Sequence, residues 1–168
     1  DPMCDADKTL ATFEKCKSHF PNALLCLSTN GLALPEHVDE IVRLGVSHVT
    51  VTVNAVTPDV GSKVYSWVRY EDKNYYGEEA ARILLARQDE GIRKLKEAGM
   101  LVKINTVVIP GVNINHVQSI SAKAKQWGAD IMNCMAMIPV HDTPFENLKS
   151  PSTEEIHRIR RSIGGDID

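Results

Sequence analysis

The sequence is poor in the residues and runs that mark several classes of protein. Its 168 residues include only four cysteines, Cys4, Cys16, Cys26 and Cys134, and no two of them form a CxxC pair. The spacing therefore indicates neither a zinc site nor a disulfide framework. No apolar run reaches the roughly 18 residues of a membrane span, and no secretory signal is visible at the start. We expect a cytoplasmic protein with reduced thiols and no membrane partner.

Positive charge is not in excess either. The net charge is −3, and no run of lysine and arginine stands out. A nucleic-acid partner would need a basic patch to meet phosphates, so this class is not indicated. The hydrophobic fraction of 43% and the charged fraction of 24% are ordinary for one globular domain of this size. We expect residues 1–168 to form a single domain, and the abrupt ends at Asp1-Pro2 and Ile167-Asp168 indicate a fragment.

Helical and extended patterns alternate along the chain. Apolar or β-branched runs predict strands, and apolar residues at helical spacing, ended by glycine or proline, predict the helices between them. Asn115 is the expected N-cap of one helix, and Ser152 with Glu155 forms the capping box of the last. Four strands with a helix between successive pairs predict a parallel sheet, either open and doubly wound or a partial (β/α) barrel. The expected strands are 23–28, 46–54, 101–109 and 129–138, and the expected helices are 7–20, 35–44, 77–98, 115–127 and one from 152.

One long segment does not fit this alternation. Residues 55–76 hold Trp67 and all four tyrosines, with no clear period. A loop of this length is uncommon in a compact domain and is often functional. We expect an irregular stretch that forms either a lid over the site or a surface loop anchored by its aromatic side chains.

Polar side chains recur on one face of every predicted strand. A parallel strand that is buried on both faces should be apolar throughout, so these residues need an explanation. They fall toward the carboxyl ends of the strands, where parallel α/β proteins bind ligands. Together they predict a common polar ligand. The residues are Cys26, Ser28 and Asn30 in the first strand, Thr50, Thr52 and Asn54 in the second, Lys103 and Asn105 in the third, and Asn133 in the fourth.

An ordered set of sequence blocks covers nearly the whole chain. These blocks are CLSTNGLALP, HVTVTVNAV, YSWVR, VKINTVVIPGVN and IPVHDTPF, after an opening Asp1-Pro2 that is similar to the end of a GPGDP segment. In this order the chain resembles the NifB family of radical S-adenosylmethionine (SAM) enzymes, which build the nitrogenase iron-molybdenum cofactor. The resemblance implies a partial (β/α) barrel of the radical SAM type, truncated on its N-terminal side.

The same resemblance implies cofactors and chemistry. A [4Fe-4S] cluster on three cysteines binds SAM and, when reduced, cleaves it to a 5′-deoxyadenosyl radical. Two further [4Fe-4S] clusters are fused around a SAM-derived carbide to give an eight-iron precursor. The implied partners are a cluster donor and the carrier or scaffold proteins of the nitrogenase cofactor.

Site residues follow from the matched blocks. Asp1 and Pro2 match the segment that receives the SAM amino group, and Thr52 and Asn54 match second-strand positions that face SAM. Ile104 matches a contact made through its backbone. The expected SAM contacts are completed by Asn105, Ser28 and Asn30, which share the polar face, and the expected metal ligand is Cys26, which matches a ligand of a substrate cluster.

The cysteine motif of the radical SAM family, CxxxCxxC, does not occur in these 168 residues. In the family it lies upstream of the GPGDP segment, and further cluster cysteines lie downstream of the matched region. We therefore expect the chain alone to be inactive. Another radical SAM enzyme and a non-catalytic α/β domain that binds a ligand or partner are the competing interpretations. Cys134 is expected to pack in the core and His141 to lie in a solvated loop.

Overall fold

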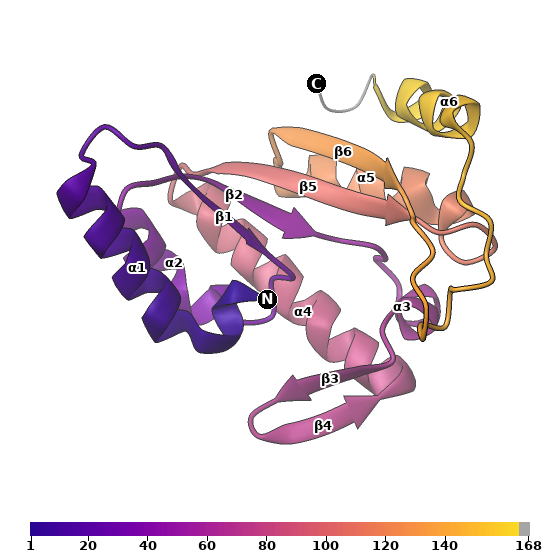
Figure 1. Cartoon of the computed structure of the whole chain (residues 1–168), viewed down its shortest axis with the longest axis horizontal. Helices are drawn as coiled ribbons and strands as arrows, with labels where there is room; N and C mark the ends of the chain where they lie inside the picture. The colour runs from indigo at the N-terminus through magenta and orange to yellow at the C-terminus, as the bar shows by residue number, and fades with distance from the viewer. Residues whose placement is uncertain (165–168) are drawn as a thin grey trace.

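A computed structural model describes residues 1–164, which form one four-stranded sheet, a separate hairpin and the helices around them (Figure 1). Among these residues, no helix combines the length and the apolar character that crossing a bilayer requires. The strands are β1 (Leu25–Thr29), β2 (Val46–Thr52), β3 (Trp67–Tyr70), β4 (Lys73–Tyr76), β5 (Leu101–Val108) and β6 (Ile131–Ala136). The helices are α1 (Ala6–His19), α2 (Leu34–Arg43), α3 (Pro58–Val64), α4 (Gly77–Glu97), α5 (Val117–Trp127) and α6 (Thr153–Ile163), with short 3₁₀ turns η1 (Pro2–Asp5) and η2 (Ile114–His116).

The main sheet is parallel throughout. Its strand order is β1-β2-β5-β6, and each neighbouring pair is parallel, as the alternation of strands and helices predicted. In residue register, Thr50 lies between Ser28 of β1 and Lys103 of β5, and Thr52 pairs with Asn105, which pairs with Asn133. All four carboxyl ends therefore meet at one edge of the sheet.

The two faces of this sheet differ sharply. One face is apolar and carries fully buried residues such as Val49, Val51, Val102 and Ile104, which pack with the helices in the main core. Helices α2, α4 and α5 all lie behind the sheet in Figure 1. A doubly wound sheet has helices on both faces, whereas the strands of a (β/α) barrel have them outside only. The open face is thus the inner face of a partial barrel, which decides between the two predicted architectures.

The prediction of an irregular stretch at 55–76 was wrong. The segment contains α3 and the antiparallel hairpin β3-β4, whose tip residues Glu71 and Asp72 have φ values of 48° and 59°. Such a two-residue turn usually contains glycine or asparagine, so Glu71 and Asp72 carry no strong hairpin signal. Val68 of the hairpin packs with Ala80 and Leu84 of α4. This packing on a neighbouring helix, which no local pattern reports, holds the hairpin in place.

Two helix starts were also predicted from caps. Ser152 and Glu155 do form the capping box of α6, with the Glu155 N–H donating to the Ser152 hydroxyl at 3.2 Å. Asn115 does not cap α5, because it lies inside η2 and α5 begins after His116 without a side-chain cap. The asparagine that structures this loop is Asn113, whose fully buried side chain donates a hydrogen bond to the Asn54 backbone oxygen at the end of β2.

Candidate functional site

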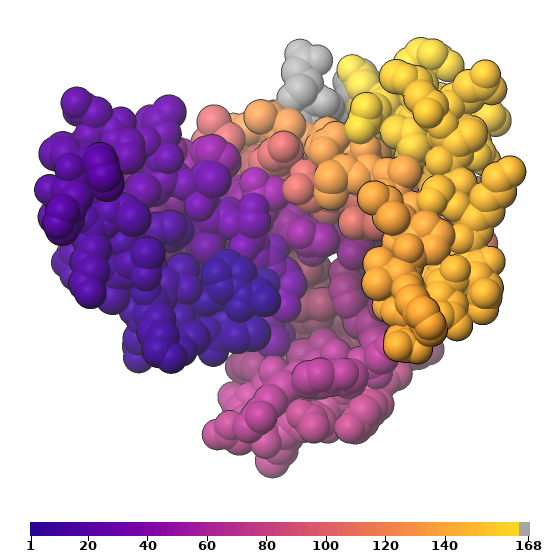
Figure 2. Space-filling view, viewed as in Figure 1, coloured from indigo at the N-terminus to yellow at the C-terminus, as the bar shows by residue number. Residues whose placement is uncertain are grey.

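The inner face of the sheet carries polar side chains in successive rows. Because register partners on neighbouring parallel strands point to the same face, the pairings place these residues side by side. Figure 2 shows this face as a recess between the N-terminal region and the residues that follow β6. The row nearest the carboxyl edge holds Thr52, Asn105 and Asn133, and the row below it holds Ser28, Thr50 and Lys103.

Asn105 is the most informative member of the upper row. Its amide oxygen is buried, yet it has no hydrogen-bond partner among the described residues. An unpaired buried polar atom costs about 1–3 kcal/mol, so it is retained where something compensates for it. Thr52, on the next strand, is half-buried with its side chain on the same face. The row therefore presents an acceptor that a polar ligand carrying N–H or O–H groups would satisfy.

A buried hydrogen-bond network fixes the carboxyl ends of β2 and β5 beside this row. The Asn113 amide group donates to the backbone oxygens of Asn54 and Val107, at 3.0 and 2.9 Å, and its oxygen accepts from the Ile109 N–H at 2.7 Å. The Asn54 side chain accepts from the Val107 N–H at 2.9 Å. Thr106 donates its hydroxyl to Val53 O at 2.8 Å. These bonds hold the two strand ends at a fixed separation.

Helix α4 supports the same edge from the outer side. Gln88, which is fully buried, donates its amide hydrogens to Asn30 O and Thr52 O, at 2.6 and 3.0 Å. Close to it, the Tyr65 hydroxyl accepts from the Asn54 N–H at 3.2 Å. Burial raises the pKa of Tyr65, partly offset by its hydrogen bonds with Asn54 and Gln88. Gly31 leaves room for Gln88, since a Cβ there would lie 2.9 Å from the Gln88 Cγ.

The N-terminal segment is tied to the end of β1 by one carboxylate. Asp1 accepts hydrogen bonds from the Thr29 hydroxyl, at 3.1 Å to each oxygen, and from the backbone N–H of Asn30. It also accepts from the Met3 N–H at 2.8 Å, where it caps η1. Pro2 follows it in the same turn and is exposed. Asp1 and Pro2 thus lie at the carboxyl edge of the sheet, at the end of β1.

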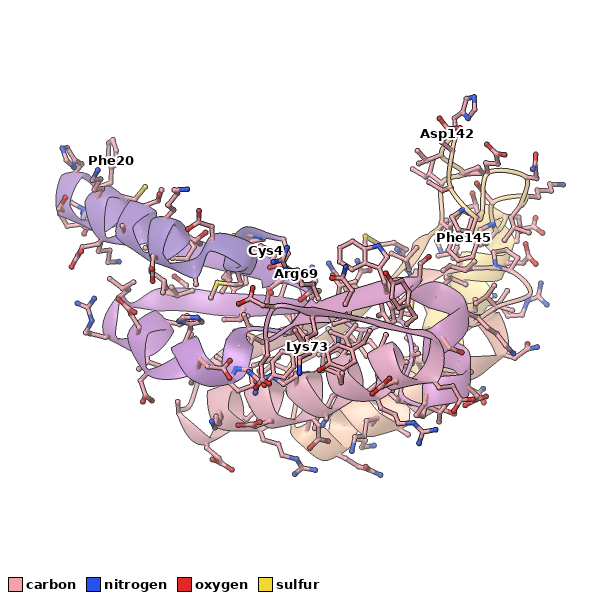
Figure 3. The ribbon with its side chains drawn as sticks, turned by 90° about the horizontal axis from the view of Figure 1, so that it is seen from below. Cys4, Phe20, Arg69, Lys73, Asp142 and Phe145 are labelled. Atoms are coloured by element: carbon pink, nitrogen blue, oxygen red, sulfur yellow. The ribbon has the colours of Figure 1, made fainter. Side chains whose placement is uncertain are left out.

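A cavity of about 550 Å³ opens beside this junction. Asp1, Cys4 and Asn30 line one side of it, and Arg69 with Tyr70 of the hairpin line another. Figure 3 shows Cys4 and Arg69 close together, far from the loop that carries Asp142 and Phe145. The hairpin therefore forms a wall of the cavity, although its Trp67 side chain remains 55% exposed.

The remaining predicted residues take distinct positions. Cys26 and Ser28 are exposed on the inner face, alternating with the buried Leu25 and Leu27. Ile104 has its side chain fully buried in the outer core, so any contact that it makes with a ligand on the inner side is through its backbone. Asn54 is buried and its side-chain oxygen is already bonded within the strand-end network.

Cys134 and His141 lie outside this face, in the positions expected for them. Cys134 is fully buried, and burial raises its pKa to about 11, as expected of a packed thiol. His141 is exposed in the loop after β6, within hydrogen-bonding distance of Asp142 and Glu146. Cys4 is exposed and Cys16 is half-buried on α1.

The sequence did not predict three residues whose side chains bond to backbone groups at the carboxyl edge of the sheet. They are Gln88, Asn113 and His116. Gln88 lies on the apolar face of a long helix, where a polar residue between buried positions is a usable signal. Asn113 follows a proline-glycine turn and reads as an ordinary loop residue. His116 accepts from the Val56 N–H at 3.1 Å, and burial lowers its pKa against an opposing effect of Asp59. Only the fold brings these three to the strand ends.

The fold and the site together define a class of protein. It is an α/β protein with a partial parallel barrel, whose inner face and carboxyl edge offer hydroxyl and amide groups, one of them unpaired, to a polar ligand.

Comparison with known proteins gives the family. The model of the radical SAM superfamily matches residues 1–124, and the chain belongs to that superfamily. The chain is 37% identical over 164 residues to the FeMo cofactor biosynthesis protein NifB of Chlorobaculum tepidum, covering 98% of this chain and 39% of the relative. For the NifB proteins of Sinorhizobium fredii and Herbaspirillum seropedicae, the identities are 43% over 169 residues and 40% over 172 residues, covering 98% and 100% of the chain. The chain spans 34% and 33% of these two relatives, and so matches about a third of a NifB protein.

These comparisons confirm the resemblance to NifB and the partial radical SAM barrel. Membership of the superfamily implies SAM and [4Fe-4S] clusters as cofactors. The inner face fits SAM, because the unpaired amide oxygen of Asn105 can accept from the amino or hydroxyl groups that SAM carries. The three-cysteine motif for the SAM-binding cluster does not occur in this sequence.

Proposed function

We propose that the chain is the central part of a NifB-type radical SAM enzyme. In the complete protein, it would help to fuse two [4Fe-4S] clusters with insertion of a SAM-derived carbide, giving the eight-iron precursor of the nitrogenase cofactor. The identity of 37–43% to NifB proteins along at least 98% of the chain is the observation that carries this proposal. The polar inner face supports it, because it offers the groups that such cofactors need.

The chain's own residues would bind and orient SAM. Thr52 and Asn105 offer a hydroxyl and an unpaired amide oxygen in one row, and Asn30 lies at the same edge of the sheet. Asp1 and Pro2 close this edge at the end of β1. When bound, one SAM molecule would supply the radical by reductive cleavage with an electron from a reduced [4Fe-4S] cluster, and another would supply the carbon by methyl transfer, while the protein positions SAM and excludes water.

The other predicted positions play supporting roles in this proposal. Ser28 extends the polar face below the SAM row, and Ile104 contributes its backbone only. Asn54 holds the strand ends through Val107 and so positions the SAM contacts rather than making one. Cys26, exposed on the inner face, is the proposed ligand of a substrate cluster.

Partners and location follow from the same proposal. An iron–sulfur cluster donor would load the enzyme, and a carrier or scaffold protein of the cofactor pathway would accept the product. We place this work in the cytoplasm, where thiols stay reduced and can bind iron.

Product analysis of the complete, anaerobically reconstituted protein tests the proposal. With SAM and a strong reductant, we expect both 5′-deoxyadenosine, from radical cleavage, and S-adenosylhomocysteine, from methyl transfer to cluster sulfide. 5′-Deoxyadenosine without S-adenosylhomocysteine would indicate another radical SAM enzyme. Neither product, with all clusters loaded, would indicate a non-catalytic binding domain.

A further inference from the structure

Strands β1 and β2 stop pairing one residue before the proposed SAM contacts. Their ladder ends where Thr29 pairs with Val51. The next residues along the two strands are Asn30 and Thr52, and both are proposed to contact SAM. Instead of pairing with each other, these two residues have backbone oxygens that accept from the Gln88 amide, at 2.6 and 3.0 Å. A side chain therefore takes the place of the next rung of the sheet.

Gln88 is an unusual residue for the position that it occupies. It reaches the strand ends from α4, on the outer side of the sheet, and it is fully buried. Its amide oxygen has no hydrogen-bond partner among residues 1–164. An unpaired buried polar atom destabilises the folded state, and an apolar side chain would avoid this effect. The two hydrogen bonds that Gln88 donates account for its presence here.

The turn after β1 is shaped around this side chain. Gly31 has a φ of 90°, and a Cβ there would lie 2.9 Å from the Gln88 Cγ. The preceding residue of α4, Arg87, donates to Leu32 O at 3.0 Å and lies over the Tyr70 ring of the hairpin. Helix α4 therefore holds two backbone oxygens of this turn at once, and Gln88 joins the turn to β2.

We propose that Gln88 is a positioning residue for SAM. The inference rests on the proposed function, which places SAM across the ends of β1 and β2. By bonding to Asn30 and Thr52 with one amide group, Gln88 fixes the separation of two residues that contact the same ligand. A ligand that bridges two strands binds more tightly when their ends are already in place, because binding then has less motion to remove. Gln88 acts from the outer side and does not touch SAM itself.

SAM binding by the complete, cluster-loaded protein tests this role. Gln88→Met keeps a long, unbranched side chain in the buried position but removes both donors. We expect its dissociation constant for SAM to rise about tenfold in calorimetry, at a temperature where circular dichroism shows the variant to be folded. In the reduced protein, the SAM concentration that half-saturates the change in the electron paramagnetic resonance signal should rise by the same factor.

Two further variants separate positioning from stability. Leu95→Ala is the matched control, because Leu95 is fully buried about two turns further along α4, and this variant should bind SAM like the wild type. Gln88→Glu provides a rescue: the protonated carboxyl group can donate to one of the two oxygens, whereas the ionised group repels both. Burial beside carbonyl oxygens should raise the pKa of this introduced carboxyl group. Its SAM affinity relative to the wild type should therefore be higher at a pH of about 6 than at about 8.

The outcomes separate the inference from the proposed function. If Gln88→Met binds SAM like the wild type, or if Leu95→Ala loses as much affinity, Gln88 is not a positioning residue. If Gln88→Met does not fold, the Gln88→Glu variant decides, and a relative affinity that is equal at both pH values overturns the inference. Weakened SAM binding in Gln88→Met, in a protein that forms 5′-deoxyadenosine but no S-adenosylhomocysteine, would support the positioning role and refute the proposed function.

Discussion

Replacing Asn113 by alanine should destabilise the protein strongly, although this residue lies in a loop. The substitution leaves the Ile109 N–H buried without its acceptor and removes donors from Asn54 O and Val107 O. One unpaired buried N–H costs about 1–3 kcal/mol, and each further hydrogen bond contributes about 0.5–1.5 kcal/mol. We therefore expect a loss of about 3 kcal/mol.

Urea unfolding of the cluster-free complete protein, followed by far-ultraviolet circular dichroism, measures this effect. With a slope of about 2 kcal/mol per molar urea, the loss lowers the midpoint by about 1.5 M. Asn115→Ala is the control, because Asn115 is exposed two residues away, and its effect should stay within about 0.5 kcal/mol. An Asn113→Ala midpoint that matches the control would refute the argument that this network holds the strand ends.

Three further predictions concern the same region and its support. Gly31→Ala should destabilise the protein by about 1–3 kcal/mol in the same urea assay, because Gly31 has a φ of 90° and a Cβ there would meet Gln88. Asn105→Ala should weaken SAM binding by the complete protein roughly tenfold in calorimetry, the equivalent of one lost hydrogen bond, and an unchanged affinity would remove Asn105 from the site. Burial opposes ionisation of Asp89, but hydrogen bonds from Arg93, Lys123 and Trp127 outweigh it and hold the pKa of Asp89 well below its usual range. This stabilisation is complete above the unfolded pKa of about 4 and is lost as the pH falls below it, so Asp89→Asn should flatten the acid side of the stability profile.

Stability and function are coupled at the carboxyl edge of the sheet. The side chains of Asn54 and Asn113 form hydrogen bonds with backbone groups at the strand ends. The Gln88 side chain also bonds to backbone there, from the outer side of the sheet. These three side chains hold the strand ends from within the protein, whereas Thr52 and Asn105 lie on the inner face, where the Asn105 amide oxygen has no partner among the described residues. Residues that hold the strand ends in place thus lie next to residues that can contact a ligand.

The sequence by itself determined the order of the four main-sheet strands and of the long helices between them, the parallel sheet, and the polar face of its strands. These features depend on local periodicity and on alternation along a strand, and both patterns are visible in the order of the residues without coordinates. Sequence blocks also identified the family, because an ordered set of matches needs no coordinates. The capping box at Ser152 and the packed Cys134 were predictable for the same reason.

Only the tertiary structure decided which residues meet across the sheet. The hairpin of 67–76 depends on packing against α4, and its turn residues carry no usual signal. The pairing of Cys26 with His48 depends on a one-residue register shift, and the role of Gln88 depends on where a helix crosses behind the strands. Such contacts join residues far apart in the chain, so their geometry is set by the packing of whole elements and not by any local pattern.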